Sequence, residues 1–220
     1  IERGYNEKVR ISCNMRVNAL GEEQFVLMRK AGFRMLLFGL ESANQATLDR
    51  LDKGIQVEDI PRACESAKKA GLEPHLTIMI GYPWETKDDA LQTLGLAKDI
   101  FRRGWADSLQ ATIVVPYPGT KLFEECREKG WLKTEDWSRY DMRENVMKTP
   151  MTGEEIKELT RSLYKVFLTP RYILRRIASL RGMDDLRFVK KGVKAVVGHL
   201  TDFATTREAQ EKQDPEESHA

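Results

Sequence analysis

The feature that most constrains this fold is a strand-like segment followed by a helix-like segment, repeated four times along the chain. Each helix-like segment is followed by a glycine, where a left-handed C-cap is expected. The strand candidates are 9–17, 34–40, 74–81 and 108–115, the helix candidates are 22–31, 57–70, 87–103 and 122–129, and the glycines are Gly32, Gly71, Gly104 and Gly130. This alternation predicts an α/β fold of parallel strands joined by right-handed crossovers.

The chain changes character after residue 150. Residues 151–167, 170–180 and 183–200 have the periodicity of three amphipathic helices. Thr152 and Glu155 have the spacing of a capping box at the start of the first of them. Residues 205–220 are polar and lack periodicity, so the sequence predicts a disordered tail there.

Three of the strand candidates have one polar and one apolar side. Successive side chains of a strand point to opposite sides, so odd and even positions can be compared separately. The more polar sets are Arg10, Ser12, Asn14 and Arg16 in the first strand, His75, Thr77, Met79 and Gly81 in the third, and Gln110, Thr112 and Val114 in the fourth. Helices are expected to cover the apolar side. The polar side then faces a ligand or, in the alternative, water or a partner domain.

Composition narrows the function classes. A net charge of +2 gives no global case for nucleic-acid or membrane binding. No apolar run reaches the roughly 18 residues of a membrane span, and no signal peptide opens the chain. Cys13, Cys64 and Cys126 are far apart and show no CxxC spacing, which favours free thiols in a reducing compartment and a cytoplasmic location.

Basic residues crowd the segment 161–194. A basic amphipathic helix can lie on anionic lipid or on RNA. The favoured interpretation is a solvated basic face, with an apolar stripe docked on the rest of the fold. That stripe consists of Leu163, Val166, Phe167, Tyr172, Ile173 and Ile177.

Glycines and polar side chains gather at the carboxyl ends of the predicted strands. These ends read Arg16-Val17-Asn18, Gly39-Leu40-Glu41-Ser42, Gly81-Tyr82-Pro83-Trp84-Glu85-Thr86 and Pro116-Tyr117-Pro118-Gly119-Thr120. Ligands of α/β folds bind at this end of the sheet. Glu41 and Gly39 lie on the same side of their strand, so Glu41 is expected to point into a site where Gly39 leaves room for a ligand.

Three of these segments resemble a known family. KAGFRMLLFGLESANQATLDRLDKG, GLEPHLTIMIGYPWETKDDALQTLGLAKDI and VVPYPGTKLFEECREKGWL are similar to the later half of a radical S-adenosylmethionine (SAM) enzyme. The resemblance is strongest to the branch that often carries an upstream cobalamin-binding domain, such as the anaerobic magnesium-protoporphyrin monomethyl ester cyclases. TPRYILRRIASLRGMDDLRFVKKG is similar to the C-terminal extension of that branch.

The resemblance implies a six-stranded partial (β/α) barrel, with strands three to six present here. Residues 1–135 then form the C-terminal part of the barrel, 136–204 a helical extension and 205–220 the tail. The CxxxCxxC motif that holds a 4Fe-4S cluster in this family is absent from the sequence. The chain is therefore expected to be a C-terminal fragment that is inactive alone.

The parent enzyme is expected to use SAM, the 4Fe-4S cluster and, where the upstream domain is present, cobalamin. Reductive cleavage of SAM in this family yields a 5′-deoxyadenosyl radical. The expected partners are a small-molecule substrate, the missing N-terminal part of the protein and an electron donor. No nucleic acid and no integral membrane segment are expected.

Individual site residues follow from the resemblance. Glu41 and Ser42 fall where the family's fourth strand presents polar groups to SAM, with Gly39 beneath them. Asn14 and Arg16 fall on the third strand, whose inward residues approach the SAM carboxylate or the substrate. Each has a structural alternative, because Glu41 could neighbour a helix N-cap or join a surface ion pair, and Arg16 could pair with a helix acid.

The resemblance also assigns residues at the last two strands. Gly81 matches the glycine of the fifth-strand GxIxGxxE pattern, whose backbone contacts adenine. The sequence departs from this pattern, with Thr77 and Met79 in place of its first glycine and isoleucine and one extra residue before Glu85. Val115, Pro116 and Tyr117 end the sixth strand, where the family packs the adenine. Glu85 and Thr86 are favoured as helix-start residues over ligand contacts, and His75 as a structural residue.

Two other functions stay open at this point. One is a non-catalytic half-barrel that binds a nucleotide or a partner protein through its polar face. The other is a radical SAM methylthiotransferase acting on tRNA, against which the absence of a recognisable small β-barrel RNA-binding domain argues.

Overall fold

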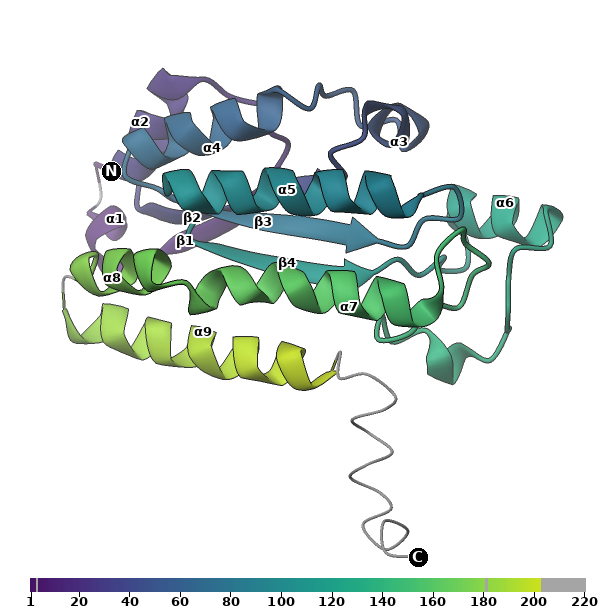
Figure 1. Cartoon of the computed structure of the whole chain (residues 1–220). Coiled ribbons are helices and arrows are strands. Elements are labelled where there is room, and N and C mark those ends of the chain that lie inside the picture. Colours follow the sequence, from purple (N-terminus) through teal and green to yellow (C-terminus); the bar gives the residue numbers. More distant parts are fainter. Residues whose placement is uncertain (3, 181, 203–220) are drawn as a thin grey trace, which may run out of the picture.

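The four predicted strands form one parallel sheet in the order β1-β2-β3-β4 (Figure 1). The strands are β1 (Ile11–Met15), β2 (Phe33–Glu41), β3 (Glu73–Ile80) and β4 (Ser108–Ile113). The computed structural model describes residues 1–2, 4–180 and 182–202, so the predicted tail 205–220 lies outside the described residues. The predicted α/β class and its parallel topology are confirmed.

The helices agree with the sequence pattern. They are α1 (Tyr5–Lys8), α2 (Glu22–Lys30), α3 (Gln45–Arg50), α4 (Asp59–Lys69), α5 (Lys87–Arg103), α6 (Lys121–Glu128), α7 (Gly153–Tyr164), α8 (Pro170–Ala178) and α9 (Met183–Asp202), with 3₁₀ turns η1 (Trp137–Arg139) and η2 (Lys165–Leu168). The four glycines that follow helices all have positive φ. Thr152 caps α7 in the predicted capping box with Glu155. No element was predicted for α3 or η1.

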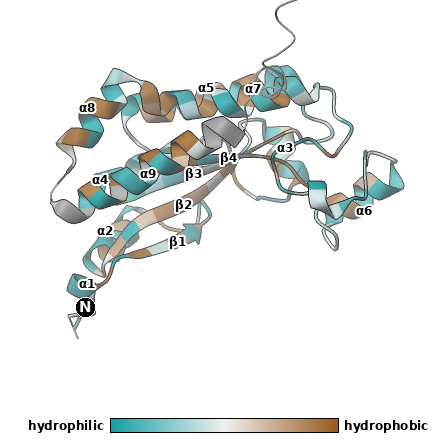
Figure 2. Cartoon of the chain, turned by 90° about the horizontal axis from the view of Figure 1, so that it is seen from below, coloured by the Kyte–Doolittle hydropathy of each residue, from teal (hydrophilic) through white to brown (hydrophobic). Residues whose placement is uncertain are grey.

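Helices cover one side of the sheet, and this side holds the main core. From Leu36 onward the even-numbered side chains of β2, and those of β3 such as Leu76 and Ile78, are buried there. Figure 2 shows β2 largely in the hydrophobic colour, beneath helices whose turns alternate between the two colours. The apolar stripe of α7 joins the same core, including Ile156.

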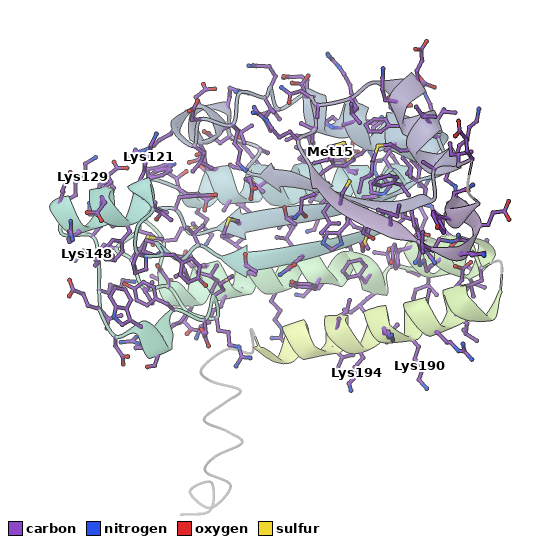
Figure 3. All side chains as sticks on the ribbon, turned by 180° about the vertical axis from the view of Figure 1, so that it is seen from behind. Met15, Lys121, Lys129, Lys148, Lys190 and Lys194 are labelled. Atoms are coloured by element: carbon purple, nitrogen blue, oxygen red, sulfur yellow. The ribbon has the colours of Figure 1, made fainter. Side chains whose placement is uncertain are left out.

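The opposite side of the sheet faces away from these helices, and Figure 3 shows the strands in front from this direction. The strand register places Asn14, Leu37, His75 and Ser108 in one row across this side. The next row toward the carboxyl ends contains Gly39, Thr77 and Gln110. The predicted polar side is therefore confirmed as the less buried side of the sheet.

β4 lies at an edge of the sheet, and a tyrosine side chain hydrogen-bonds to the backbone on the edge that no described strand covers. The Tyr164 hydroxyl donates to the Ala111 carbonyl at 2.8 Å and accepts from the Ala111 N–H at 2.9 Å. The N–H of Ile113 donates to the Met142 carbonyl at 3.4 Å. These contacts satisfy backbone groups at a sheet edge, where unpaired groups invite association.

The expectation that the whole apolar stripe of the C-terminal helices packs on the rest of the fold is wrong for part of that stripe. Leu163, Val166 and Phe167 are buried as expected, whereas Ile173 and Ile177 are 44% and 60% exposed. α8 turns these two side chains outward because its arginines and Tyr172 make the inward contacts. Within the described part of the chain, no helix has the length and apolarity needed to cross a membrane.

Candidate functional site

An open hollow lies at the carboxyl ends of β1 and β2, on the side of the sheet away from the helices. Its volume is about 460 Å³. It is lined by Asn14, Met15, Arg16, Leu37, Gly39, Glu41, Lys53, Ile55 and Thr77. Four of the residues that the sequence indicated, Asn14, Arg16, Gly39 and Glu41, are thus brought together at the predicted end of the sheet.

Glu41 reaches the hollow through an irregularity in the sheet. The register of β2 against β3 shifts between Gly39 and Glu41, and Glu41 has a φ of 57°. Its Oε1 accepts a hydrogen bond from Lys53 Nζ at 2.8 Å, and its side chain is 12% exposed. A Cβ added to Gly39 would lie 2.7 Å from the same Oε1. Gly39 therefore makes room first for the Glu41 carboxylate.

A loop after α3 closes one side of the hollow, and Arg16 holds it there. The Arg16 guanidinium donates from Nη2 to the Lys53 carbonyl, and Asn18 Nδ2 donates to the Gly54 carbonyl at 2.8 Å. A Cβ on Gly54 would lie 2.9 Å from Arg16 Nη2. Arg16 thus hydrogen-bonds to the backbone of this loop. The alternative expected from the sequence, an ion pair of Arg16 with an acidic residue on a helix, is not what the structure shows.

Lys53 is the charged residue of the hollow that the sequence did not indicate, and Met15, Leu37 and Ile55 are apolar lining residues that it also did not indicate. Lys53 lies in a loop, so neither strand alternation nor helical periodicity indicates its direction. The one available signal is its neighbour Gly54, whose positive φ of 57° marks a turn that brings the loop back toward β1. Lys53 thus adds a cation to a site whose other polar residues were predicted from their positions in the strands and at the strand ends.

Ser42 lies outside this hollow. Its side chain is fully buried on the helix side, 3.4 Å from Thr93 Oγ1, and it accepts a hydrogen bond from the Asn44 N–H at 3.1 Å. Asn44 in turn caps α3 by accepting from the Thr47 N–H. In this structure Ser42 anchors the start of α3.

Gly81 begins a tight turn that Glu85 closes. Gly81 has a φ of 101°, and a Cβ there would meet Ile156 of α7 at 3.3 Å. Its N–H donates to Glu85 Oε2 at 2.6 Å, while Glu85 Oε1 is buried without a hydrogen-bond partner among the described residues. Burial raises the pKa of Glu85 to about 7, against the lowering effect of its backbone hydrogen bonds. Of the two residues read as helix-start chemistry, Thr86 caps α5 and Glu85 instead folds back onto the strand end.

Val115, Pro116 and Tyr117 do not line the hollow. Val115 belongs to a second apolar cluster with Tyr82, Val146 and Met147. Pro116 is also buried, and the Tyr117 hydroxyl donates to the Tyr140 carbonyl at 3.1 Å. The segment 131–148, joined by a bridge between Leu132 and Met147, thus lies against the end of β4.

The three thiols lie on three different elements. Cys13 is in β1, Cys64 in α4 and Cys126 in α6, and burial raises the pKa of each thiol. Among the described residues, no group of three His, Cys, Asp or Glu side chains could hold a metal ion.

Comparison with known proteins places the chain in a family. The model of the radical SAM superfamily matches residues 1–97. An uncharacterized methyltransferase of Pyrococcus horikoshii is 32% identical over 181 residues, which cover 81% of this chain and 39% of that protein. The anaerobic magnesium-protoporphyrin IX monomethyl ester cyclase of Cereibacter sphaeroides is 28% identical over 171 residues, which cover 76% of this chain and 27% of that protein. The chain belongs to the radical SAM superfamily.

Solved structures support the radical SAM type of fold. The methyltransferase TsrM of Kitasatospora setae, with tryptophan and a SAM analogue bound, has a TM-score of 0.57 at 14% identity over 77% of this chain and 39% of that one. The archaeal Elp3 of Methanocaldococcus infernus has a TM-score of 0.55 at 21% identity over 74% of this chain and 34% of that one. The radical SAM chain described here thus spans well under half the length of these proteins.

Proposed function

We propose that this chain forms part of the SAM- and substrate-binding barrel of a radical SAM enzyme. The hollow at the ends of β1 and β2 is the observation that supports this most. SAM carries a carboxylate, an ammonium group and ribose hydroxyls. Arg16 is suited to the carboxylate, while Glu41 and Asn14 can accept from the ammonium group or the hydroxyls.

The cluster ligands belong, in this proposal, to protein outside these 220 residues. The sequence lacks CxxxCxxC, and the chain spans 39% of the Pyrococcus relative and 27% of the Cereibacter cyclase. A reduced 4Fe-4S cluster, when bound by such ligands, supplies the electron that cleaves SAM. The residues of this chain bind and orient SAM and substrate and exclude water.

The reaction class is proposed only broadly. The relatives include proteins named as methyltransferases and as cyclases. One solved relative contains cobalamin together with a cluster, and its fold resembles this chain with a TM-score of 0.51. Hydrogen abstraction or methyl transfer from SAM, with cobalamin held by another domain where present, is therefore the range of chemistry proposed. Appended domains and loops set the substrate in such folds.

SAM binding by the 220-residue chain tests the proposal. Isothermal titration calorimetry is expected to show saturable binding that Arg16→Gln and Glu41→Gln each weaken roughly tenfold, since a hydrogen bond to a charged group contributes about 1.5–3 kcal/mol. Arg62→Gln on α4 and Glu135→Gln are the matched controls, because both side chains are exposed and outside the hollow. Absence of SAM binding, or equal losses in the controls, would contradict the proposal.

Cleavage of SAM tests the assignment of the cluster ligands separately. Protein that includes a CxxxCxxC segment and a reconstituted cluster is expected to convert SAM to methionine and 5′-deoxyadenosine under a strong reductant. The 220-residue chain, treated identically, is expected to release neither product. Cleavage by the chain alone would overturn the placement of the ligands but not the SAM site.

A further inference from the structure

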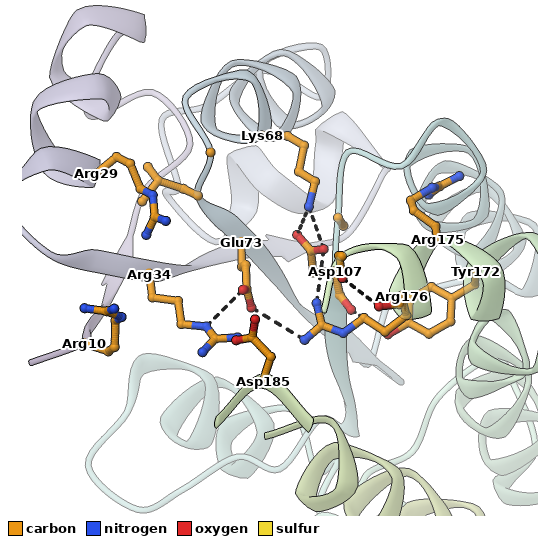
Figure 4. Close-up of a pocket in the computed structure, with 14 residues that line it drawn as sticks. Arg10, Arg29, Arg34, Lys68, Glu73, Asp107, Tyr172, Arg175, Arg176 and Asp185 are labelled. Atoms are coloured by element: carbon orange, nitrogen blue, oxygen red, sulfur yellow. Dashed lines mark hydrogen bonds and ion pairs between the residues drawn. The ribbon is translucent and has the colours of Figure 1, made fainter. Parts of the chain in front are cut away.

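α8 turns Tyr172, Arg175 and Arg176 toward the body of the protein. The Tyr172 hydroxyl donates to the Asp107 carbonyl at 2.8 Å. The Arg175 guanidinium donates to the carbonyls of Phe101 and Arg102 at 2.9 and 3.1 Å, so it caps the end of α5. Arg176 lies 3.5 Å from Asp107 and 3.7 Å from Glu73 at the amino ends of the strands (Figure 4).

The apolar side chains of α8 point outward as a consequence. Ile173, Leu174 and Ile177 are 44%, 68% and 60% exposed, and Leu168 just before the helix is 61% exposed. An amphipathic surface helix normally buries its apolar stripe and exposes its charges. Here the direction is largely reversed, so the solvent side of α8 is aliphatic apart from the exposed Arg171.

α9 carries apolar side chains and lysines together on its exposed side. Leu186, Val193 and Val197 are 49%, 58% and 57% exposed. Lys190 and Lys194 lie between them at helical spacing, and both extend away from the protein in Figure 3. We call this surface, Leu168 and the exposed residues of α8 and α9, the α8–α9 face.

The exposed charged side chains described on this face are all cations. Among the side chains described between residues 168 and 198, every exposed charged group is a cation. These groups are Arg171, Arg187, Lys190, Lys191 and Lys194. Asp185 is half-buried and lies 2.8 Å from Arg34. Like charges oppose pairing of this face with a second copy of itself, whereas they favour an anionic partner.

We propose that the α8–α9 face docks on an anionic lipid surface. Cations beside exposed aliphatic side chains are the combination by which interfacial helices bind headgroups and insert into the acyl boundary. Single-stranded nucleic acid is instead held by aromatic side chains that stack on bases. No exposed side chain described on α8 or α9 is aromatic. This docking is independent of the function proposed for the hollow.

Vesicle flotation with the full 220-residue chain tests the electrostatic part. Binding is expected to vesicles of phosphatidylcholine with phosphatidylglycerol, weakly or not at all to phosphatidylcholine alone, and less at high salt. Lys190→Gln with Lys194→Gln is expected to weaken binding roughly 25-fold, since each lysine near an anionic surface contributes about fivefold. Lys121→Gln with Lys148→Gln is the matched control, because these lysines are exposed elsewhere on the protein.

A second pair of variants tests insertion. Leu174→Ser with Ile177→Ser is expected to weaken binding at least tenfold, while Leu27→Ser with Leu91→Ser, exposed on α2 and α5, leaves it within about twofold. Thermal unfolding confirms that each variant is folded. Equal binding to neutral vesicles, equal loss in the control pairs, or capture of a mixed-sequence RNA in preference to anionic vesicles would overturn the proposal.

Discussion

Gly39 and Glu41 determine each other's geometry in the hollow. The Glu41 carboxylate lies where the side chain of any other residue at position 39 would begin, and Lys53 holds it there. A methyl group at position 39 would displace the end of a flexible side chain rather than backbone. The consequence is expected in ligand binding more than in folding.

Gly39→Ala is therefore predicted to weaken SAM binding several-fold while lowering the free energy of unfolding by no more than about 1 kcal/mol. Calorimetric titration and urea denaturation measure the two effects. Gly95→Ala is the control, because Gly95 lies inside α5 with nothing within 4 Å of an added Cβ. That variant is expected to gain about 0.5–1 kcal/mol of stability and to bind SAM as the wild type does. An unchanged SAM affinity in Gly39→Ala would show that the side chain at position 39 does not affect ligand binding through Glu41.

The raised pKa of Glu85 predicts that the stability of the protein depends on pH. Its folded-state pKa of about 7 lies above the ordinary value of 4.5, so the folded protein retains a proton that the unfolded chain releases. The stability contributed by this group is present below pH 4.5 and is lost as the pH rises to about 7. By linkage the loss is on the order of 3 kcal/mol.

The measurement compares urea denaturation of wild type and Glu85→Gln from pH 4.5 to 8. The stability of the wild type relative to the variant is expected to fall with rising pH and to level off above about pH 7. The comparison of two proteins is needed because His75, whose pKa burial lowers to about 4, contributes the opposite slope up to its ordinary value of 6.5. A difference that stays constant with pH would show that Glu85 is ionised throughout.

The sequence predicted part of the candidate site and could not predict the rest. Strand alternation placed Asn14, Gly39 and Glu41 correctly on one side, because side-chain direction in a strand follows from position alone. Ser42 was assigned by the family resemblance, whereas its even position places it on the helix side with Leu36 and Phe38, where its hydroxyl lies beside Thr93. Lys53 enters from a loop whose path depends on tertiary contacts.

At the scale of elements, a side chain from α7 satisfies backbone groups at the outer edge of β4. The Tyr164 hydroxyl satisfies both the N–H and the carbonyl of Ala111. Tyr164→Phe keeps the ring in the core and leaves these two buried backbone groups without that partner. The predicted loss is about 1–3 kcal/mol in the free energy of unfolding, measured in urea. Tyr5→Phe, at an exposed residue of α1, is expected to change it by less than about 0.5 kcal/mol.

Helices and strands were predicted well where the residues that define their ends are close in sequence, and poorly where distant contacts define them. α5 was predicted with its observed bounds because Thr86 at its start and Gly104 at its end are local caps. α3 was missed, since six residues are too few to show periodicity and its cap, Asn44, is held by a distant hydrogen bond to Asp89. The antiparallel bridge of Leu132 with Met147 joins residues with no alternating pattern between them.

At the scale of the whole molecule, the C-terminal region supplies part of the core beneath the site. Ile156 packs against Gly81 at the end of β3, and Tyr164 pairs with β4. The buried apolar side chains from residues 151–168 are Met151, Ile156, Leu159, Leu163, Tyr164, Val166 and Phe167. The boundary expected at residue 135 stays a prediction, and these contacts make it testable.

A chain ended after residue 150 is predicted not to fold cooperatively. Burying one large apolar side chain contributes about 1.5–3 kcal/mol, so losing seven removes an amount comparable to the roughly 5–15 kcal/mol that stabilises a typical domain. A chain ended after residue 180 keeps all seven and the Arg175 cap on α5, so it is expected to unfold in one transition at a lower urea concentration than the full chain. Near-ultraviolet circular dichroism and urea titration distinguish the two truncations. Cooperative unfolding of the shorter chain would show that the barrel strands are stable without α7, in which case the barrel and the helical extension are separate folding units.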